Sequence, residues 1–258
     1  ITGACRPDRH YMVELKPRLE KIKRMIDAGD YMTLSRPRQY GKTTTLRMLA
    51  GYLETDYLVI SLDFQRISQA DFVHEAAFVH ALAREFGRRV RRMQEVPDTV
   101  KEELADFADR TDTGVRLADF FDCLSGWCGQ TEKPIVLLID EVDTASDHQV
   151  FLDFLAQLRA AYLDRDEMPA FQSVILAGLY DIKNLKLRIR PDSERKYNSP
   201  WNIAAKLPVD LSFSKGQIAA MLEEYESDRQ TGMDVQSVAD EIRQYTAGYP
   251  YLVCAVCK

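Results

Sequence analysis

Short apolar runs alternate along this chain with longer stretches in which apolar residues recur every three or four positions. The short runs predict strands and the longer stretches predict helices. Strands are expected at residues 31–35, 57–64, 135–141, 171–177 and 207–213, and helices at residues 15–26, 43–53, 71–93, 148–163 and after residues 99 and 117. Several strands are apolar at every position, which is typical of a parallel sheet covered on both faces. The pattern therefore predicts an α/β fold.

The same pattern divides the chain into three parts. Residues 1–30 are expected to form a helical arm, and residues 31–213 a core of alternating strands and helices. Residues 214–258 have helical spacing throughout and predict a small all-helical lid. The chain starts with Ile1 rather than Met and stops inside a predicted helix. We therefore expect a piece of a longer protein, with the lid truncated at its C-terminus.

The stretch RPRQYGKTTTL, residues 36–46, has the order of strand, turn and helix that a phosphate-binding loop needs. In such a loop Gly41 permits close backbone approach, Lys42 reaches the β- and γ-phosphates, and the Thr43 hydroxyl binds Mg²⁺. The residues expected to surround the phosphates are Arg38, Gln39, Tyr40, Gly41, Lys42, Thr43 and Thr44. Arg36 stands where the pattern G-x-x-x-x-G-K-[ST] has its first glycine. A chance match at a helix start is therefore the alternative.

A second motif, IVLLIDEVD at residues 135–143, is an apolar strand that ends in adjacent carboxylates. Charged groups at the end of a buried strand are unfavourable unless they serve a function. We expect Asp140 to hold Mg²⁺ through water opposite Thr43, and Glu141 to activate the attacking water as a general base. Asp143 is expected to be a solvated or capping residue, with a functional role as the alternative. Two motifs in this order favour a nucleotide site over a chance match.

Composition and charge narrow the possible partners. The net charge is −6 and the pI about 5.4, so the chain as a whole lacks the basic character of a nucleic-acid binder. No apolar run approaches the roughly 20 residues of a membrane-spanning helix. Five scattered cysteines, an odd number, are typical of a reducing compartment, and we expect the cytoplasm. Cys254 and Cys257 form a C-x-x-C, which we interpret as buried helix residues rather than a metal or redox site.

One local run of the sequence is basic. In REFGRRVRRM, residues 84–93, helical spacing places four arginines on one face, namely Arg84, Arg88, Arg91 and Arg92. We expect a solvated face that is balanced by nearby acids such as Glu85. The alternative is a patch that binds nucleic acid or an acidic partner.

Taken together, the segments RPRQYGKTTTL, SLDFQ, LIDEVD, SVILAGLYDIKNLKLRIRP, YNSPWNIA and TAGYPYLV resemble the bacterial AAA-ATPase-like family. The resemblance runs from about His10 to Lys258. This family is similar to archaeal-type ATPases and to the signal-transduction ATPases with numerous domains, and its members often carry a restriction-endonuclease-like domain after the ATPase module. No such domain lies within these residues. The loops of these relatives look like G-P-R-R-x-G-K-T, so only Arg36 departs from them.

The resemblance implies a P-loop NTPase core with Mg-ATP held between the sheet edge and the helical lid. It also implies that Pro250, in the Gly-x-Pro at residues 248–250, lies near the adenine. In related ATPases the strand after the carboxylate pair often ends in a polar residue that senses the γ-phosphate. This chain has Ala177 and Gly178 there, so we expect slow hydrolysis.

Three arginines follow that strand, at positions 188, 190 and 195. Each can stabilise phosphate charge as a bidentate donor, and each also fits an ordinary surface position. We expect Arg190 to take the catalytic role. The sequence leaves open whether it would act in its own subunit or in a neighbouring one.

We therefore expect an ATP-binding module, with ATP and Mg²⁺ as cofactors, that hydrolyses ATP slowly and acts as a switch. One alternative is a small-molecule kinase on the same fold. Another is a module that binds nucleic acid or a protein partner and uses ATP as a structural or regulatory ligand. GTP is disfavoured because the sequence has no N-K-x-D guanine motif.

Overall fold

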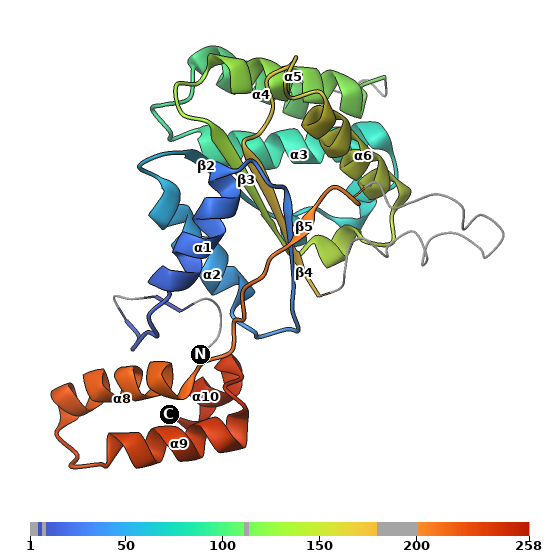
Figure 1. Ribbon diagram of the computed structural model, residues 1–258. Coiled ribbons are helices and arrows are strands. Elements are labelled where there is room, and N and C mark those ends of the chain that lie inside the picture. The colour runs from blue at the N-terminus through green and yellow to red at the C-terminus, as the bar shows by residue number, and fades with distance from the viewer. Residues whose placement is uncertain (1–4, 7–8, 111–113, 180–200, 258) are drawn as a thin grey trace.

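The computed structural model describes residues 5–6, 9–110, 114–179 and 201–257. Within these residues, five parallel strands form a central sheet and helices cover both of its faces (Figure 1). The predicted α/β class with a parallel sheet is confirmed, and so is the group of helices at the C-terminal end.

The strands are β1 (Met32–Ser35), β2 (Leu58–Asp63), β3 (Ile135–Asp140), β4 (Ser173–Gly178) and β5 (Ala205–Lys206). Their order across the sheet is β2-β3-β4-β1-β5, so β4 separates the strand of the phosphate loop from the strand of the carboxylates. The strand predicted at residues 207–213 is wrong, because β5 ends at Lys206. Pro208 has no N–H to continue the ladder. Residues 207–213 instead lead from the sheet to the lid.

The described helices are α1 (Lys16–Asp27), α2 (Lys42–Leu53), α3 (Glu75–Val90), α4 (Asp98–Asp109), α5 (Leu117–Gln130), α6 (Gln149–Leu163), α8 (Lys215–Arg229), α9 (Val235–Thr246) and α10 (Pro250–Val256). Short 3-10 turns lie at η1 (Phe64–Arg66), η2 (Gln69–Phe72) and η3 (Val142–Ala145). The helix predicted from residue 71 begins only at Glu75, because Asp71 accepts a hydrogen bond from the Ser68 N–H and closes η2.

Alternate residues of the inner strands face two hydrophobic clusters, as the pleat of a strand requires. In β3, Leu137 and Ile139 pack against the layer of α3, α4, α5 and α6, whereas Val136 and Leu138 pack against α1 and α2. Every residue of β3 is buried. This burial on both faces explains why the strand is a continuous apolar run in the sequence.

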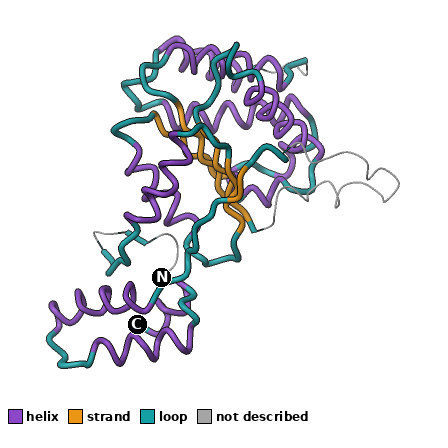
Figure 2. The backbone as a smooth tube through the Cα atoms, viewed as in Figure 1, coloured by secondary structure: helices purple, strands orange, loops and turns teal. Residues whose placement is uncertain are grey.

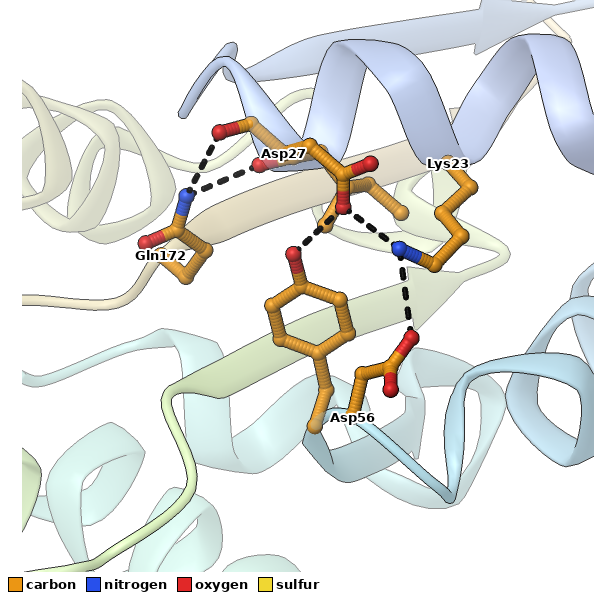
Figure 3. A network of polar contacts seen from close by, with 6 residues as sticks. Lys23, Asp27, Asp56 and Gln172 are labelled. Carbon is orange, nitrogen blue, oxygen red and sulfur yellow. Dashed lines mark hydrogen bonds and ion pairs between the residues drawn. The ribbon is translucent and has the colours of Figure 1, made fainter.

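A polar network ties the end of α1 to the chain just before β2 and β4 (Figure 3). Lys23 Nζ pairs with Asp27 at 2.8 Å and with Asp56 at 3.2 Å. The Tyr57 hydroxyl donates to Asp27 at 2.6 Å, and Gln172 Nε2 donates to the Ile26 carbonyl at 2.9 Å. The charged groups are partly exposed, so each pair contributes little energy. The network lies at the amino ends of the strands, and their carboxyl ends are left for the candidate site.

The lid consists of α8, α9 and α10, and the tube in Figure 2 shows these helices as a separate group at the lower left, apart from the strands. α8 starts at a capping box in which Ser214 Oγ accepts from the Gln217 N–H at 3.2 Å. Gly248 joins α9 to α10 in the left-handed region, with φ +73°. Its carbonyl accepts a hydrogen bond from the Phe213 N–H at 2.8 Å. The turn between the last two helices is thereby fixed to the segment that leaves the sheet.

We expect Gly248→Ala to destabilise the protein by about 2–3 kcal/mol, because its backbone is left-handed and a Cβ would overlap the Phe213 carbonyl oxygen. The free energy of unfolding in urea measures this. Gly216→Ala is the matched control, since Gly216 lies in α8 with open space around it and alanine favours a helix. Equal stability of Gly248→Ala and the unsubstituted protein would contradict the assignment.

Candidate functional site

The phosphate loop connects β1 to α2, which begins at Lys42. Gly41, with φ +83°, and Gln39, with φ +60°, both adopt left-handed backbone conformations. The free N–H groups and the dipole of α2 favour an anion at this helix start. Lys42 is buried, and its Nζ donates to the carbonyls of Arg36 at 2.9 Å and Pro37 at 3.1 Å. The ammonium group therefore lies against the loop itself.

Arg36, which replaces the first glycine of the loop pattern, directs its side chain toward the segment that leads to the lid. Its Nη2 donates to the Val209 carbonyl at 2.8 Å and its Nη1 to the Ser35 carbonyl at 3.0 Å. Its backbone N–H donates to the Gly178 carbonyl at the end of β4, at 3.1 Å. The carbonyl of Arg36 thus accepts a hydrogen bond from Lys42, and its guanidinium donates to the segment that leads to the lid.

Thr43 and Asp140 meet at the carboxyl edge of the sheet, as the sequence predicts. Thr43 Oγ1 donates to Asp140 Oδ2 at 2.5 Å, and the Glu141 N–H donates to Asp140 Oδ1 at 2.9 Å. Burial raises the pKa of Asp140, although these two hydrogen bonds and the Lys42 charge act in the opposite direction. A carboxylate and a hydroxyl from distant parts of the chain are therefore held together in a partly desolvated position.

Glu141 has an unusual backbone for a non-glycine residue, with φ +55°. This conformation ends β3 abruptly and places Glu141 in the wall of the cavity described below. Burial, and then the neighbouring Asp140 carboxylate, raise the pKa of Glu141. Strained backbone of this kind is common at functional sites.

Asp143 caps the end of the neighbouring strand. Its Oδ2 accepts from the Leu179 N–H at 2.5 Å, and a Cβ on Gly178 would lie 3.0 Å from both of its carboxylate oxygens. Gly178 therefore permits the close approach of this carboxylate. The geometry favours the capping interpretation of Asp143.

Asp63 is a carboxylate at the same edge of the sheet that the sequence analysis missed. It ends β2 directly opposite Asp140 in the parallel register. Its charge acts to raise the pKa of both Asp140 and Glu141. The segment SLDF carries the same signal as the recognised motif, an apolar strand that ends in a carboxylate.

A cavity of about 620 Å³ adjoins the loop. Its polar side is formed by residues 39–45 and Glu141. An apolar side is contributed by Met12, Val13 and Leu15 of the arm and by Phe213, among others. The cavity therefore has the mixed lining of a small-molecule site, polar at the loop and apolar away from it. The arm was not predicted to line the site.

The lid closes another side of this cavity and contacts the loop. Pro250, the first residue of α10, lines the cavity. The Tyr249 hydroxyl donates to the Arg38 carbonyl, and the Tyr249 and Tyr40 rings meet edge to face with centroids 4.9 Å apart. Arg38 is exposed and does not line the cavity, unlike the other residues predicted to bind phosphate.

The remaining candidate residues are not part of the cluster that the structure describes. Arg190, with Arg188 and Arg195, falls outside the described residues. In the basic run, Arg84 pairs with Asp71 at 3.5 Å and Arg88 with Glu85 at 3.1 Å, so acids balance part of that face.

The interpretation of Cys254 and Cys257 as buried residues is wrong. Cys254 is half-buried and Cys257 is exposed. In α10 the buried positions are Pro250 and Val253, so the cysteines lie beside the packed face rather than within it.

Comparison with known proteins agrees with this geometry. The family model described as AAA-like domain matches residues 3–257. The chain belongs to the AAA-like domain family. Its sheet, phosphate loop and C-terminal helices are those of an AAA-like P-loop ATPase module.

Two curated relatives are similar over part of their length. The spermidine/putrescine import ATP-binding protein of Lawsonia intracellularis is 32% identical over 168 residues, which cover 57% of this chain and 44% of that protein. The sulfate/thiosulfate import ATP-binding protein of Rhodopseudomonas palustris is 29% identical over 165 residues, which cover 55% and 47%. The similarity thus spans less than half of each relative.

Among solved structures, the Walker-type ATPase of Pyrococcus abyssi is similar with a TM-score of 0.64. The match covers 98% of this chain and 68% of that one, at 17% identity. At this identity the likeness shows a shared fold. None of the helices in the described part of the chain is long and apolar enough to cross a membrane.

The raised pKa of Glu141 predicts a pH-dependent effect of Glu141→Gln on stability. The folded protein binds the proton of the Glu141 carboxyl group more tightly than the unfolded chain does. The free energy of unfolding therefore falls as the pH rises from about 4.5, the ordinary pKa, through the higher pKa of the folded state. We expect the variant to be the more stable protein at about pH 7, with the advantage lost near pH 4. Urea unfolding across this range measures it, with the exposed Glu102→Gln as control. A constant difference at all pH values would refute the prediction.

Proposed function

We propose that this chain binds Mg-ATP in the cavity between the phosphate loop, the arm and the lid, and that it hydrolyses ATP slowly. The observation that most directly supports the proposal is the 2.5 Å contact of the Thr43 hydroxyl with Asp140, one residue after the buried Lys42. Both curated relatives are ATP-binding proteins, which supports the same nucleotide for this chain.

The loop would bind the phosphates through backbone N–H groups at the start of α2 and through Lys42. The ammonium group of Lys42 would exchange the carbonyls of Arg36 and Pro37 for phosphate oxygens, which are stronger acceptors because they are charged. Thr44 would add a hydroxyl donor beside them. The apolar side of the cavity, with Pro250, would receive the adenine.

The residues at the sheet edge fit Mg²⁺, which prefers oxygen ligands and retains several waters. The Thr43 hydroxyl would be a direct ligand, and Asp140 would hold the ion through water. In the part of the chain that the structure describes, no group of three or more His, Cys, Asp or Glu side chains could hold a metal by itself. The remaining ligands would therefore be phosphate oxygens and water. Bound Mg²⁺ would supply positive charge that neutralises the phosphates.

Glu141 would orient the attacking water and accept its proton. Its raised pKa brings it closer to the working pH of a general base, and its backbone places it in the cavity wall. Arg190 would add positive charge at the γ-phosphate. The end of β4 offers Gly178 beside the Asp143 carboxylate rather than a polar donor. A negative group at that position is consistent with slow turnover.

The position of the lid would depend on whether the γ-phosphate of the nucleotide is present. The Tyr249 hydroxyl donates to the loop carbonyl of Arg38, and Pro250 lines the cavity where the adenine would lie. ATP that contacts both loop and lid favours the closed arrangement, and loss of the γ-phosphate removes part of that preference. Slow hydrolysis would make the module a timed switch.

We expect Lys42→Ala to weaken ATP binding at least about 100-fold, because it removes a charge-assisted donor to the phosphates. Glu141→Gln should retain ATP binding and lower turnover by about 10²–10⁴-fold, because it removes the base. Isothermal titration and phosphate release measure the two effects. Lys206→Ala is the matched lysine control, since Lys206 is exposed in β5. Unchanged nucleotide affinity of Lys42→Ala would disprove the site.

Phosphate release also separates hydrolysis from kinase activity. Release from ATP with no added acceptor excludes a pure small-molecule kinase, whereas release that needs an acceptor favours one.

We expect Tyr249→Phe to speed the release of an ATP analogue by about five-fold, because it removes one hydrogen bond worth about 1 kcal/mol between lid and loop. Stopped-flow dissociation of a fluorescent analogue measures the rate. Tyr245→Phe serves as the control, since Tyr245 is exposed on the same lid. Identical rates for the two variants would argue against the lid contact as a restraint on release.

A further inference from the structure

Main-chain groups of different segments hold Arg36 in place at the entrance of the phosphate loop. Its backbone N–H donates to the Gly178 carbonyl at the end of β4, at 3.1 Å. Its Nη1 donates to the Ser35 carbonyl at 3.0 Å, and its Nη2 donates to the Val209 carbonyl, in the segment that leads to the lid, at 2.8 Å. Arg36 is half-buried and does not line the cavity. Its guanidinium therefore anchors the loop to the protein itself.

The carbonyl groups at this anchored point hold the side chain of Lys42. The Lys42 ammonium donates to the carbonyl oxygen of Arg36 at 2.9 Å and to that of Pro37 at 3.1 Å. Lys42 is only 5% exposed, and a buried ammonium group without acceptors is unfavourable. The ring of Pro37 fixes its φ, which limits the freedom of this pair of carbonyls. The loop therefore supplies Lys42 with acceptors of its own.

A phosphate group has to compete with these carbonyls for the same ammonium donors. Phosphate oxygens are charged and are the stronger acceptors, so a phosphate can displace the carbonyls. The net gain is smaller than for a lysine without partners, because existing hydrogen bonds are exchanged for new ones. The size of that gain depends on how firmly the Arg36 carbonyl is held. A glycine at this position, as in the usual loop pattern, has no side chain that could fix it.

We infer that Arg36 is a positioning residue that lowers the affinity of the loop for nucleotide, because its anchored carbonyl competes with phosphate for Lys42. The inference rests on the proposed function, since it concerns the same lysine. It reverses the simple electrostatic expectation, in which a positive side chain next to a phosphate site strengthens binding. The sign of the effect therefore distinguishes an anchor of the loop from a phosphate ligand.

The first test is the affinity for a fluorescent, non-hydrolysable ATP analogue with Mg²⁺. We expect Arg36→Met to bind it about three- to tenfold more tightly than the unsubstituted protein, because methionine cannot donate to the Val209 carbonyl. Fluorescence titration measures the dissociation constant. Arg36→Gly, which restores the glycine of the loop pattern, is the second variant and should shift the affinity in the same direction.

Lys21→Met is the matched control for a loosened connection. Lys21 Nζ donates to the Pro208 carbonyl at 2.7 Å, next to Val209, and Lys21 does not line the cavity. This variant should bind the analogue like the unsubstituted protein. Weaker binding by Arg36→Met would identify Arg36 as a phosphate ligand and overturn the inference. An equal gain in Lys21→Met would also overturn it, because loosening the connection would then be sufficient.

The second test measures how Lys42 is held and needs no nucleotide. Reductive methylation with formaldehyde and cyanoborohydride modifies accessible amines, and mass spectrometry follows the peptide that contains Lys42. We expect Lys42 to react about three- to tenfold faster in Arg36→Met and Arg36→Gly, and at an unchanged rate in Lys21→Met. The exposed Lys206 is the internal reference and should react equally in all of them. Unchanged reactivity of Lys42 in both Arg36 variants would contradict the inference.

The two tests together separate this inference from the proposed function. If no variant binds the analogue but Lys42 reacts faster in Arg36→Met, the ATP site is refuted and the hold of Arg36 on Lys42 is supported. If the unsubstituted protein binds the analogue but Arg36→Met changes neither the affinity nor the reactivity, the inference alone fails. The thermal midpoint of each variant is measured alongside, so that a loss of folding is not taken for a change in affinity.

Discussion

Parallel pairing of the strands is the constraint on which the site depends. Parallel strands end at the same edge of a sheet, so the residues that follow β1, β2 and β3 meet there although they are far apart in the chain. The hydrogen bond between Thr43 and Asp140 joins positions 97 residues apart. The register that places Asp63 opposite Asp140 adds a further carboxylate to the same edge. The hydrophobic clusters on the two faces hold these ends in place.

The chemistry of the site follows from burial at that edge. Partial desolvation raises the pKa of Asp140 and of Glu141, so the negative charge is held there against its solvation preference. Such a site gains most from a cation, which the metal ion of a metal–phosphate complex would supply. The left-handed backbones of Gln39 and Glu141 flank this position. Their strain is tolerated because the sheet and α2 fix the residues on either side.

The arm and the connection to the lid give the cavity its closed form. Arg18 of α1 donates to the Ser212 carbonyl at 2.6 Å and to Gln217 at 2.9 Å, and Arg36 donates to the Val209 carbonyl. Residues 207–213 are thus held by guanidinium groups from both the arm and the loop. Because Arg36 also offers its carbonyl to Lys42, the proposed phosphate site would be linked to the lid connection through this one residue. Arg36, which replaces the first glycine of the usual loop pattern, therefore has a structural role.

The sequence by itself determined four of the five described strands and the functional residues that follow β1 and end β3. A strand buried on both faces must be apolar throughout, so Ile135–Asp140 was predictable, and a phosphate loop and a carboxylate pair can be recognised because each lies within a few consecutive residues. The tertiary structure alone decided the direction of the Arg36 side chain and the contact of Tyr249 with the loop. It also ended the last strand at Lys206, where Leu207, Val209 and Leu211 pack into the core beyond the sheet. Periodicity reports which face of an element is buried, whereas these contacts depend on which distant segment covers that face.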